Sequence, residues 1–91
     1  MPFEKILILD DEPIVCRALQ SQLRRKRYNV AAAGSMAEAE GILAADHFDM
    51  VFMDLRLPDG DGTQLLEKVA HQPDAPFMVV MTGYATVESA V

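Results

Sequence analysis

Short apolar runs alternate with helix-like segments along the chain, and this alternation constrains the fold more than any other feature. Four runs have the composition of strands, and they span residues 6–9, 28–33, 50–53 and 77–81. Strand–helix alternation favours a parallel sheet with right-handed crossovers. The sequence therefore predicts an α/β fold in which the C-terminal ends of all strands meet at one edge of the sheet.

The segments between the runs carry signals of helices and turns. Apolar residues recur every fourth residue from Val15, which gives one apolar helix face, and four cations at 24–27 suit the end of that helix. Ser35 and Glu38 form a capping box, which predicts a helix to about residue 45. The run LPDGDG at 57–62 is typical of a loop. Further helices are expected at 63–69 and from residue 86 onward.

Length and charge restrict the class of protein. The 91 residues allow one small domain. The net charge of −6 argues against direct nucleic-acid binding, which needs a basic face. No apolar stretch is long enough to cross a bilayer, and the N-terminus does not resemble a signal peptide. The single cysteine fits a reducing cytosol, so we expect a cytoplasmic protein with no membrane contact, in which Cys16 is a small buried side chain.

Polar side chains follow three of the predicted strands. Asp10 and Asp11 come after the first strand, Asp54 after the third and Thr82 after the fourth. Adjacent carboxylates repel one another, so a bound cation is expected, and oxygen ligands of this kind suit Mg²⁺. A carboxylate such as that of Asp54 can act as a nucleophile toward a phosphoryl group. The Thr82 hydroxyl can donate a hydrogen bond to a phosphoryl oxygen.

Three stretches of the chain resemble one family. LILDDEP, VFMDLRLPDGDG and VVMTGYATVESAV are similar to the receiver domain of two-component response regulators, and the resemblance covers all 91 residues. The last stretch is most similar to receivers of enhancer-binding transcriptional activators. The resemblance implies a flavodoxin-like (CheY-like) doubly wound parallel sheet with strand order 2-1-3-4. A receiver normally has five strand–helix units, so residues 1–91 are expected to form a receiver truncated within the fourth helix. The fifth strand, the fifth helix and the lysine after the fifth strand are then absent.

The resemblance also implies a role for each residue of the site. Asp54 would accept a phosphoryl group from a sensor histidine kinase and would be a ligand of Mg²⁺. Asp11 would bind this ion directly, Asp10 would act mainly through water, and the main-chain carbonyl of Arg56 would complete the protein ligands. Thr82 would be the switch hydroxyl that moves toward the phosphoryl group. Such a domain controls an output domain or effector outside this chain, and it is not a conventional enzyme.

Alternative functions remain open at this point. A phosphorylation-independent pseudo-receiver would share the fold but bind little Mg²⁺. A phosphatase or phosphotransferase with an aspartate nucleophile normally has a D-x-D pair after one strand, which this sequence lacks. A flavin-binding flavodoxin would need a phosphate-cradling loop after the first strand. The fourth strand is expected to form an exposed apolar edge, which predicts a dimer through that edge or an exchange of elements between copies.

Overall fold

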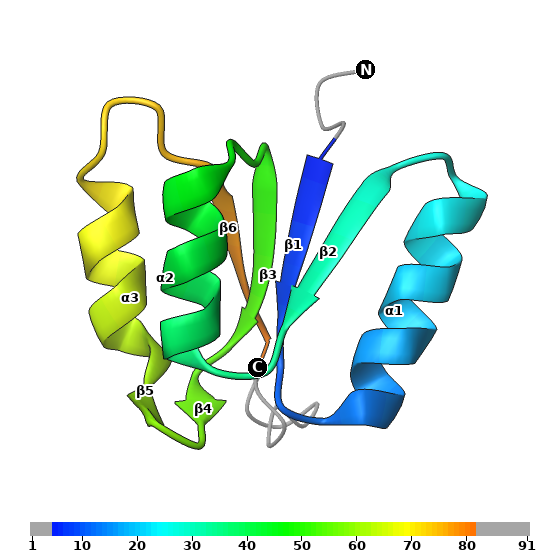
Figure 1. The fold of residues 1–91 in the computed structure, drawn as a ribbon, viewed down its shortest axis with the longest axis horizontal. Coiled ribbons are helices and arrows are strands. Elements are labelled where there is room, and N and C mark those ends of the chain that lie inside the picture. The colour runs from blue at the N-terminus through cyan, green and yellow to red at the C-terminus, as the bar shows by residue number, and fades with distance from the viewer. Residues whose placement is uncertain (1–4, 82–91) are drawn as a thin grey trace, which may run out of the picture.

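The chain folds around a four-stranded parallel sheet in a computed structural model that describes residues 5–81 (Figure 1). The strand order is β2-β1-β3-β6, and every neighbouring pair is parallel. This confirms the predicted fold class and the order 2-1-3-4, with β6 as the fourth strand. The strands are β1 (Lys5–Leu9), β2 (Asn29–Ala33), β3 (Met50–Asp54) and β6 (Phe77–Met81). The helix expected from residue 86 and the site residue Thr82 lie outside the described residues.

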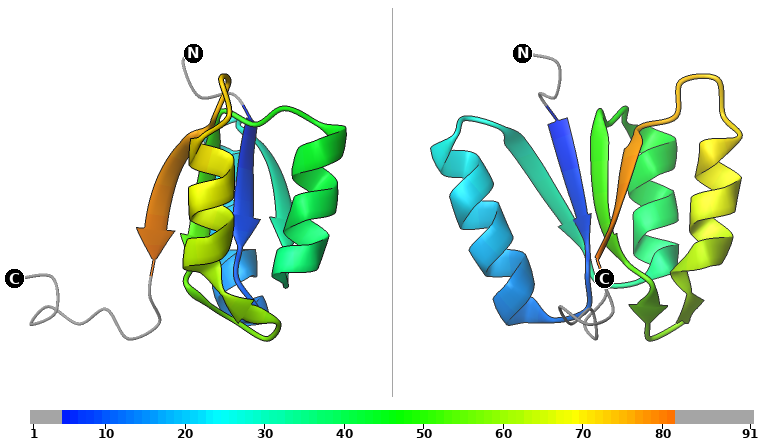
Figure 2. Two further views of the ribbon diagram at one scale, coloured as in Figure 1. Left: turned by 90° about the vertical axis from the view of Figure 1, so that its left-hand side faces the viewer. Right: turned by 180° about the vertical axis from the view of Figure 1, so that it is seen from behind.

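Three helices connect the strands: α1 (Pro13–Arg25), α2 (Met36–Ala45) and α3 (Gly62–Ala70). The chain moves from β1 outward to β2 and then back past β1 to β3. Right-handed crossovers in opposite directions place their helices on opposite faces of the sheet. Figures 1 and 2 accordingly show α2 and α3 on one side of the sheet and α1 on the other.

The main hydrophobic core lies between the sheet and the pair α2 and α3. Alternate strand residues point into it, and both helices add side chains. Its buried members include Leu7, Leu9, Val51, Met53, Ala39, Leu65 and Val69. The opposite face contributes Ile6 and Ile8, which are also fully buried.

Helix α1 is covered less than its sequence pattern predicts. It contains no buried residue, and the side chains of Ile14 and Val15 are 80% and 40% exposed. Leu19 and Leu23 are half-buried, and so is Cys16, which corrects the expectation of a buried cysteine. The physical reason is that α1 alone packs on its face of the sheet within the described residues, whereas α2 and α3 support each other on the opposite face.

Local hydrogen bonds define the start of α2. The Ser35 hydroxyl accepts from the Glu38 amide at 3.2 Å, and the Glu38 carboxylate accepts from the Gly34 amide at 2.7 Å. This is the predicted capping box, except that Glu38 bonds the amide of the residue before Ser35.

The predicted loop at 57–62 is largely part of a small hairpin that the sequence did not predict. The hairpin is formed by β4 (Arg56–Leu57) and β5 (Gly60–Asp61).

Strand β6 forms one edge of the sheet within residues 5–81. It pairs with β3, and its side chains Phe77 and Val80 are 59% and 43% exposed. An apolar edge of this kind can template pairing with another strand. Pairing of two copies through this edge stays a prediction.

No helix among the described residues combines the length and apolar character needed to cross a membrane.

We predict that Leu65→Ala lowers the free energy of unfolding by about 3 kcal/mol, because it removes a fully buried side chain and leaves a cavity between α3 and the sheet. Ile14→Ala is the matched control on α1, and it should change the free energy of unfolding by less than about 0.5 kcal/mol. Urea unfolding followed by circular dichroism measures both. Equal losses in the two variants would contradict the described core.

Candidate functional site

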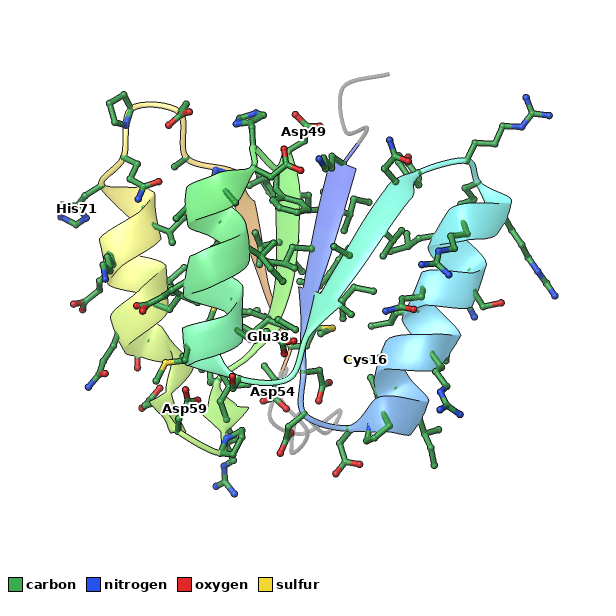
Figure 3. All side chains as sticks on the ribbon, viewed as in Figure 1. Cys16, Glu38, Asp49, Asp54, Asp59 and His71 are labelled. Carbon is green, nitrogen blue, oxygen red and sulfur yellow. The ribbon has the colours of Figure 1, made fainter. Side chains whose placement is uncertain are left out.

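Three carboxylates meet at the edge of the sheet where the strands end. Asp54 is the last residue of β3, and Asp10 and Asp11 follow β1. Each offers one oxygen such that the three oxygens lie within 4.8 Å of one another. Figure 3 shows Asp54 at the lower end of the sheet, toward which all strands point. The structure therefore brings together the three predicted acidic site residues, while Thr82 lies outside the described part of the chain.

The register of the sheet accounts for this meeting. Leu9 of β1 pairs with Met53 of β3, so the next residue of each strand, Asp10 or Asp54, lies at the same level. The Asp10 amide also donates to the Ala33 carbonyl at 3.0 Å, which extends the pairing of β1 and β2 by one residue. The main chain thus fixes both carboxylates at the edge.

Each of the two buried carboxylates is oriented by a main-chain amide two residues further along the chain. Asp10 Oδ1 accepts from the Glu12 amide at 2.9 Å, and Asp54 Oδ1 accepts from the Arg56 amide at 3.0 Å. This is the geometry of an Asx turn. The second of these bonds places the main chain of Arg56 beside the acidic cluster.

The cluster is electrostatically unfavourable without a cation. Asp10 and Asp54 are each only 6% exposed, whereas Asp11 is exposed. Burial raises the pKa of Asp10 above its ordinary value, and the negative charges of Asp54 and Asp11 raise it further, against the opposing effect of the Glu12 amide. A bound cation would favour the charged form of all three groups.

The thiol of Cys16, on α1, contacts the main chain of this site. Its Sγ donates to the main-chain carbonyl of Asp10 at 3.1 Å. Burial raises the pKa of this thiol, and the charge of Asp10 adds to the effect, so the protonated donor is favoured. The sequence did not predict this contact, although the position of Cys16 in the first turns of the helix after Asp10 is compatible with it.

The hairpin after Asp54 folds tightly against the end of β3. The Gly62 amide donates to the Leu55 carbonyl at 2.7 Å. A Cβ atom at Gly62 would lie 3.0 Å from the Asp54 carbonyl oxygen and 3.1 Å from Leu55 Cα. Only glycine allows this close approach of two main-chain segments. The tight turn keeps the hairpin next to the acidic cluster.

The donor set fits a hard divalent cation. Three carboxylates and nearby main-chain oxygens are ligands that Mg²⁺ and Ca²⁺ both take, and Mg²⁺ usually retains several waters beside one or two carboxylates. The residues that could hold such an ion are Asp10, Asp11 and Asp54, with the Arg56 carbonyl as the predicted fourth ligand. A cation at this position would offset the repulsion between the two buried carboxylates, Asp10 and Asp54, and the exposed Asp11.

Comparison with known proteins gives matches along nearly the whole chain. The model of the response regulator receiver domain family matches residues 6–91. The response regulator protein PilR from Pseudomonas aeruginosa is 32% identical over 91 residues, which are 100% of this chain and 20% of PilR. The alginate biosynthesis transcriptional regulatory protein AlgB from Pseudomonas putida is 37% identical over 89 residues, or 96% of this chain and 19% of AlgB. The chain thus spans about one fifth of the length of these relatives.

A solved structure shares both the fold and the sequence similarity. It is a response regulator protein from Burkholderia pseudomallei with a phosphorylated aspartic acid, a calcium ion and citrate. It has a TM-score of 0.82 and 31% identity to this chain, and the match covers 96% of this chain and 51% of that one. Together with the family match over residues 6–91, these similarities show that the chain belongs to the response regulator receiver domain family.

Proposed function

We propose that this chain is the phosphoacceptor domain of a two-component response regulator and that Asp54 accepts the phosphoryl group in a Mg²⁺-dependent reaction. The observation that carries the proposal is the meeting of Asp10, Asp11 and Asp54 within 4.8 Å at the end of the sheet. A relative of known structure contains a phosphorylated aspartic acid and a calcium ion, which supports the same chemistry here.

Each residue of the site has a distinct part in the proposed reaction. Asp11 would hold the cation directly and Asp10 mainly through water. When bound, the cation would offset the charge of the carboxylates and of the incoming phosphoryl group. The Arg56 amide fixes one oxygen of Asp54 and thereby orients the carboxylate. An Asp54 oxygen attacks phosphorus, the P–N bond of a phosphohistidine in a sensor histidine kinase breaks, and an acyl phosphate forms. Thr82 is the proposed hydroxyl donor to this phosphoryl group.

The proposed consequence is a switch that controls an output outside this chain. The modification replaces the single negative charge of the Asp54 carboxylate with a phosphoryl group of about −1.5 to −2 charge and three acceptor oxygens, at a site that is already acidic. Thr82 would convert this local change into a shift between two conformations. The transcriptional role in the name of AlgB supports an output in transcription control. The domain would act in the cytoplasm and, since each chain accepts one phosphoryl group, not as a conventional enzyme.

We predict that incubation with acetyl phosphate and Mg²⁺ gives a phosphoryl adduct on the wild-type chain, detected by intact-mass analysis. Omission of Mg²⁺ should abolish the adduct, because the charges of the three carboxylates then repel the phosphate. Asp54→Ala should also abolish it, since the nucleophile is lost. Glu67→Gln, which neutralises an exposed acid on α3, should retain the adduct. No wild-type adduct under any condition, together with little Mg²⁺ binding, would overturn the proposal in favour of a pseudo-receiver.

We further predict that Asp10→Asn increases the free energy of unfolding of the metal-free chain at pH 7. Asparagine keeps the oxygen that accepts from the Glu12 amide but removes a charge that burial disfavours. Because the folded-state pKa of Asp10 lies above the ordinary value of 3.8, the native state binds more protons than the unfolded state at pH values between these two pKa values. The free energy of unfolding of the wild type therefore falls as the pH rises through this range. The stability difference between the variant and the wild type should therefore grow as the pH rises above about 4.

Chemical unfolding from pH 4 to pH 7, with and without Mg²⁺, measures this difference. Mg²⁺ should stabilise the wild type through preferential binding to the folded state and should stabilise Asp10→Asn less. Asp11→Asn is the matched control in metal-free protein, and its gain in stability should be smaller because Asp11 is exposed. A destabilised Asp10→Asn variant in metal-free buffer would contradict the electrostatic account.

A further inference from the structure

The tip of the hairpin after Asp54 is joined to the start of α2 by a single carboxylate. Asp59 lies in this tip, and its two oxygens accept from two successive main-chain amides. Oδ1 accepts from the Met36 amide at 2.9 Å, and Oδ2 accepts from the Ala37 amide at 3.0 Å. Figure 3 shows Asp59 on the hairpin at the lower end of α2. A residue from a distant loop thus caps the helix.

The carboxylate of Asp59 suits this position electrostatically. Met36 and Ala37 are the first two residues of α2, where amides have no acceptor within the helix and a negative charge is favoured. The two hydrogen bonds lower the pKa of Asp59 below its ordinary value, so the charged form is favoured. The contact is therefore between an ionised carboxylate and two donors that need an acceptor.

The helix has its own cap, and Asp59 does not duplicate it. The capping box of Ser35 and Glu38 engages the amides of Glu38 and Gly34. Asp59 engages a different pair of amides, those of Met36 and Ala37. The start of α2 is thus held by a local device within the helix and by a second device that also holds the hairpin. The two devices can be removed separately by mutation.

A packing contact supports the same junction. Gly60 follows Asp59 and has a φ of +146°, a conformation that favours glycine. A Cβ atom built at Gly60 would lie 2.6 Å from Cε of Met36. The hairpin tip therefore contacts both the amide and the side chain of Met36. The ladder of the hairpin has only two residue pairs, and its base is held by the Gly62–Leu55 hydrogen bond and by the buried Leu57 side chain, so Asp59 adds a separate contact at the tip.

We propose that Asp59 is a positioning residue of the phosphoacceptor site, a role that rests on the proposed function of Asp54. By tying the hairpin to α2, Asp59 keeps the Arg56 amide on Asp54 and the Arg56 main chain beside the position of the cation. Because coupling between two sites is reciprocal, cation binding at the acidic cluster must also strengthen the contact of Asp59 with α2. The start of α2 then responds to the state of the site.

The first experiment compares Asp59→Ala with Ser35→Ala in the 91-residue chain. Both remove a cap from α2, but only Asp59→Ala releases the hairpin. In metal-free protein, amide exchange measured by NMR should become faster at Arg56 and Gly62 in Asp59→Ala and stay unchanged in Ser35→Ala. Mg²⁺ affinity measured by calorimetry should fall about tenfold in Asp59→Ala, as for other groups that orient metal ligands, and less than about twofold in Ser35→Ala.

The second experiment measures the reciprocal effect. Mg²⁺ should slow amide exchange at Met36 and Ala37 in the wild type, and it should not do so in Asp59→Ala. Asp59→Asn retains one acceptor oxygen and should give an intermediate Mg²⁺ affinity. Equal effects of Asp59→Ala and Ser35→Ala on the hairpin amides and on Mg²⁺ affinity would overturn the proposal.

The metal-free measurement separates this proposal from the proposed function. If the wild type binds no Mg²⁺, the function proposed for Asp54 fails. The exchange of the Arg56 and Gly62 amides then decides the positioning role alone. Unchanged exchange at both amides in Asp59→Ala overturns it, and faster exchange in that variant but not in Ser35→Ala supports it.

Discussion

The parallel pairing of β1 with β3 is the constraint on which the rest of the site depends. Paired residues of these two strands are 44 positions apart in the sequence. Residues 6–9 pair with residues 50–53 in a register that brings the ends of the strands level. Two carboxylates that repel each other are thereby held at one edge by main-chain hydrogen bonds. The free energy that offsets this repulsion comes from the burial of apolar strands between the helices. The core and the acidic cluster are therefore parts of one arrangement: a stable sheet holds an unfavourable site ready for a cation.

The two faces of the sheet have different parts in this arrangement. The face under α2 and α3 supplies most of the buried core. It also carries the junction at Asp59, so the helix that helps to stabilise the fold also contacts the hairpin after Asp54. Helix α1 packs more loosely, yet its Cys16 thiol contacts the carbonyl of Asp10. The site is thus supported from both faces, by the Cys16 thiol on the side of α1 and by the hairpin on the side of α2.

Much of this could be predicted from the sequence, for reasons that are physical. The apolar runs at 6–9 and 50–53 predicted buried parallel strands, and the polar residue after each run predicted where Asp10 and Asp54 would meet. The exposure of α1 could not be predicted, because a helix pattern does not say what else covers its face of the sheet. The contact of Asp59 with α2 was missed for a similar reason, since Asp59 and Met36 are distant in sequence and the run LPDGDG reads as a loop whatever it touches.

The Asx turns at Asp10 and Asp54 have a consequence for sequence variation. The groups that orient these carboxylates are the amides of Glu12 and Arg56, and every amino acid except proline has such an amide. These two hydrogen bonds therefore do not depend on which side chain, proline aside, stands at position 12 or 56. A substitution that changes the charge or size of either side chain can thus alter the surroundings of the acidic cluster while the Asx turns that orient Asp10 and Asp54 are retained.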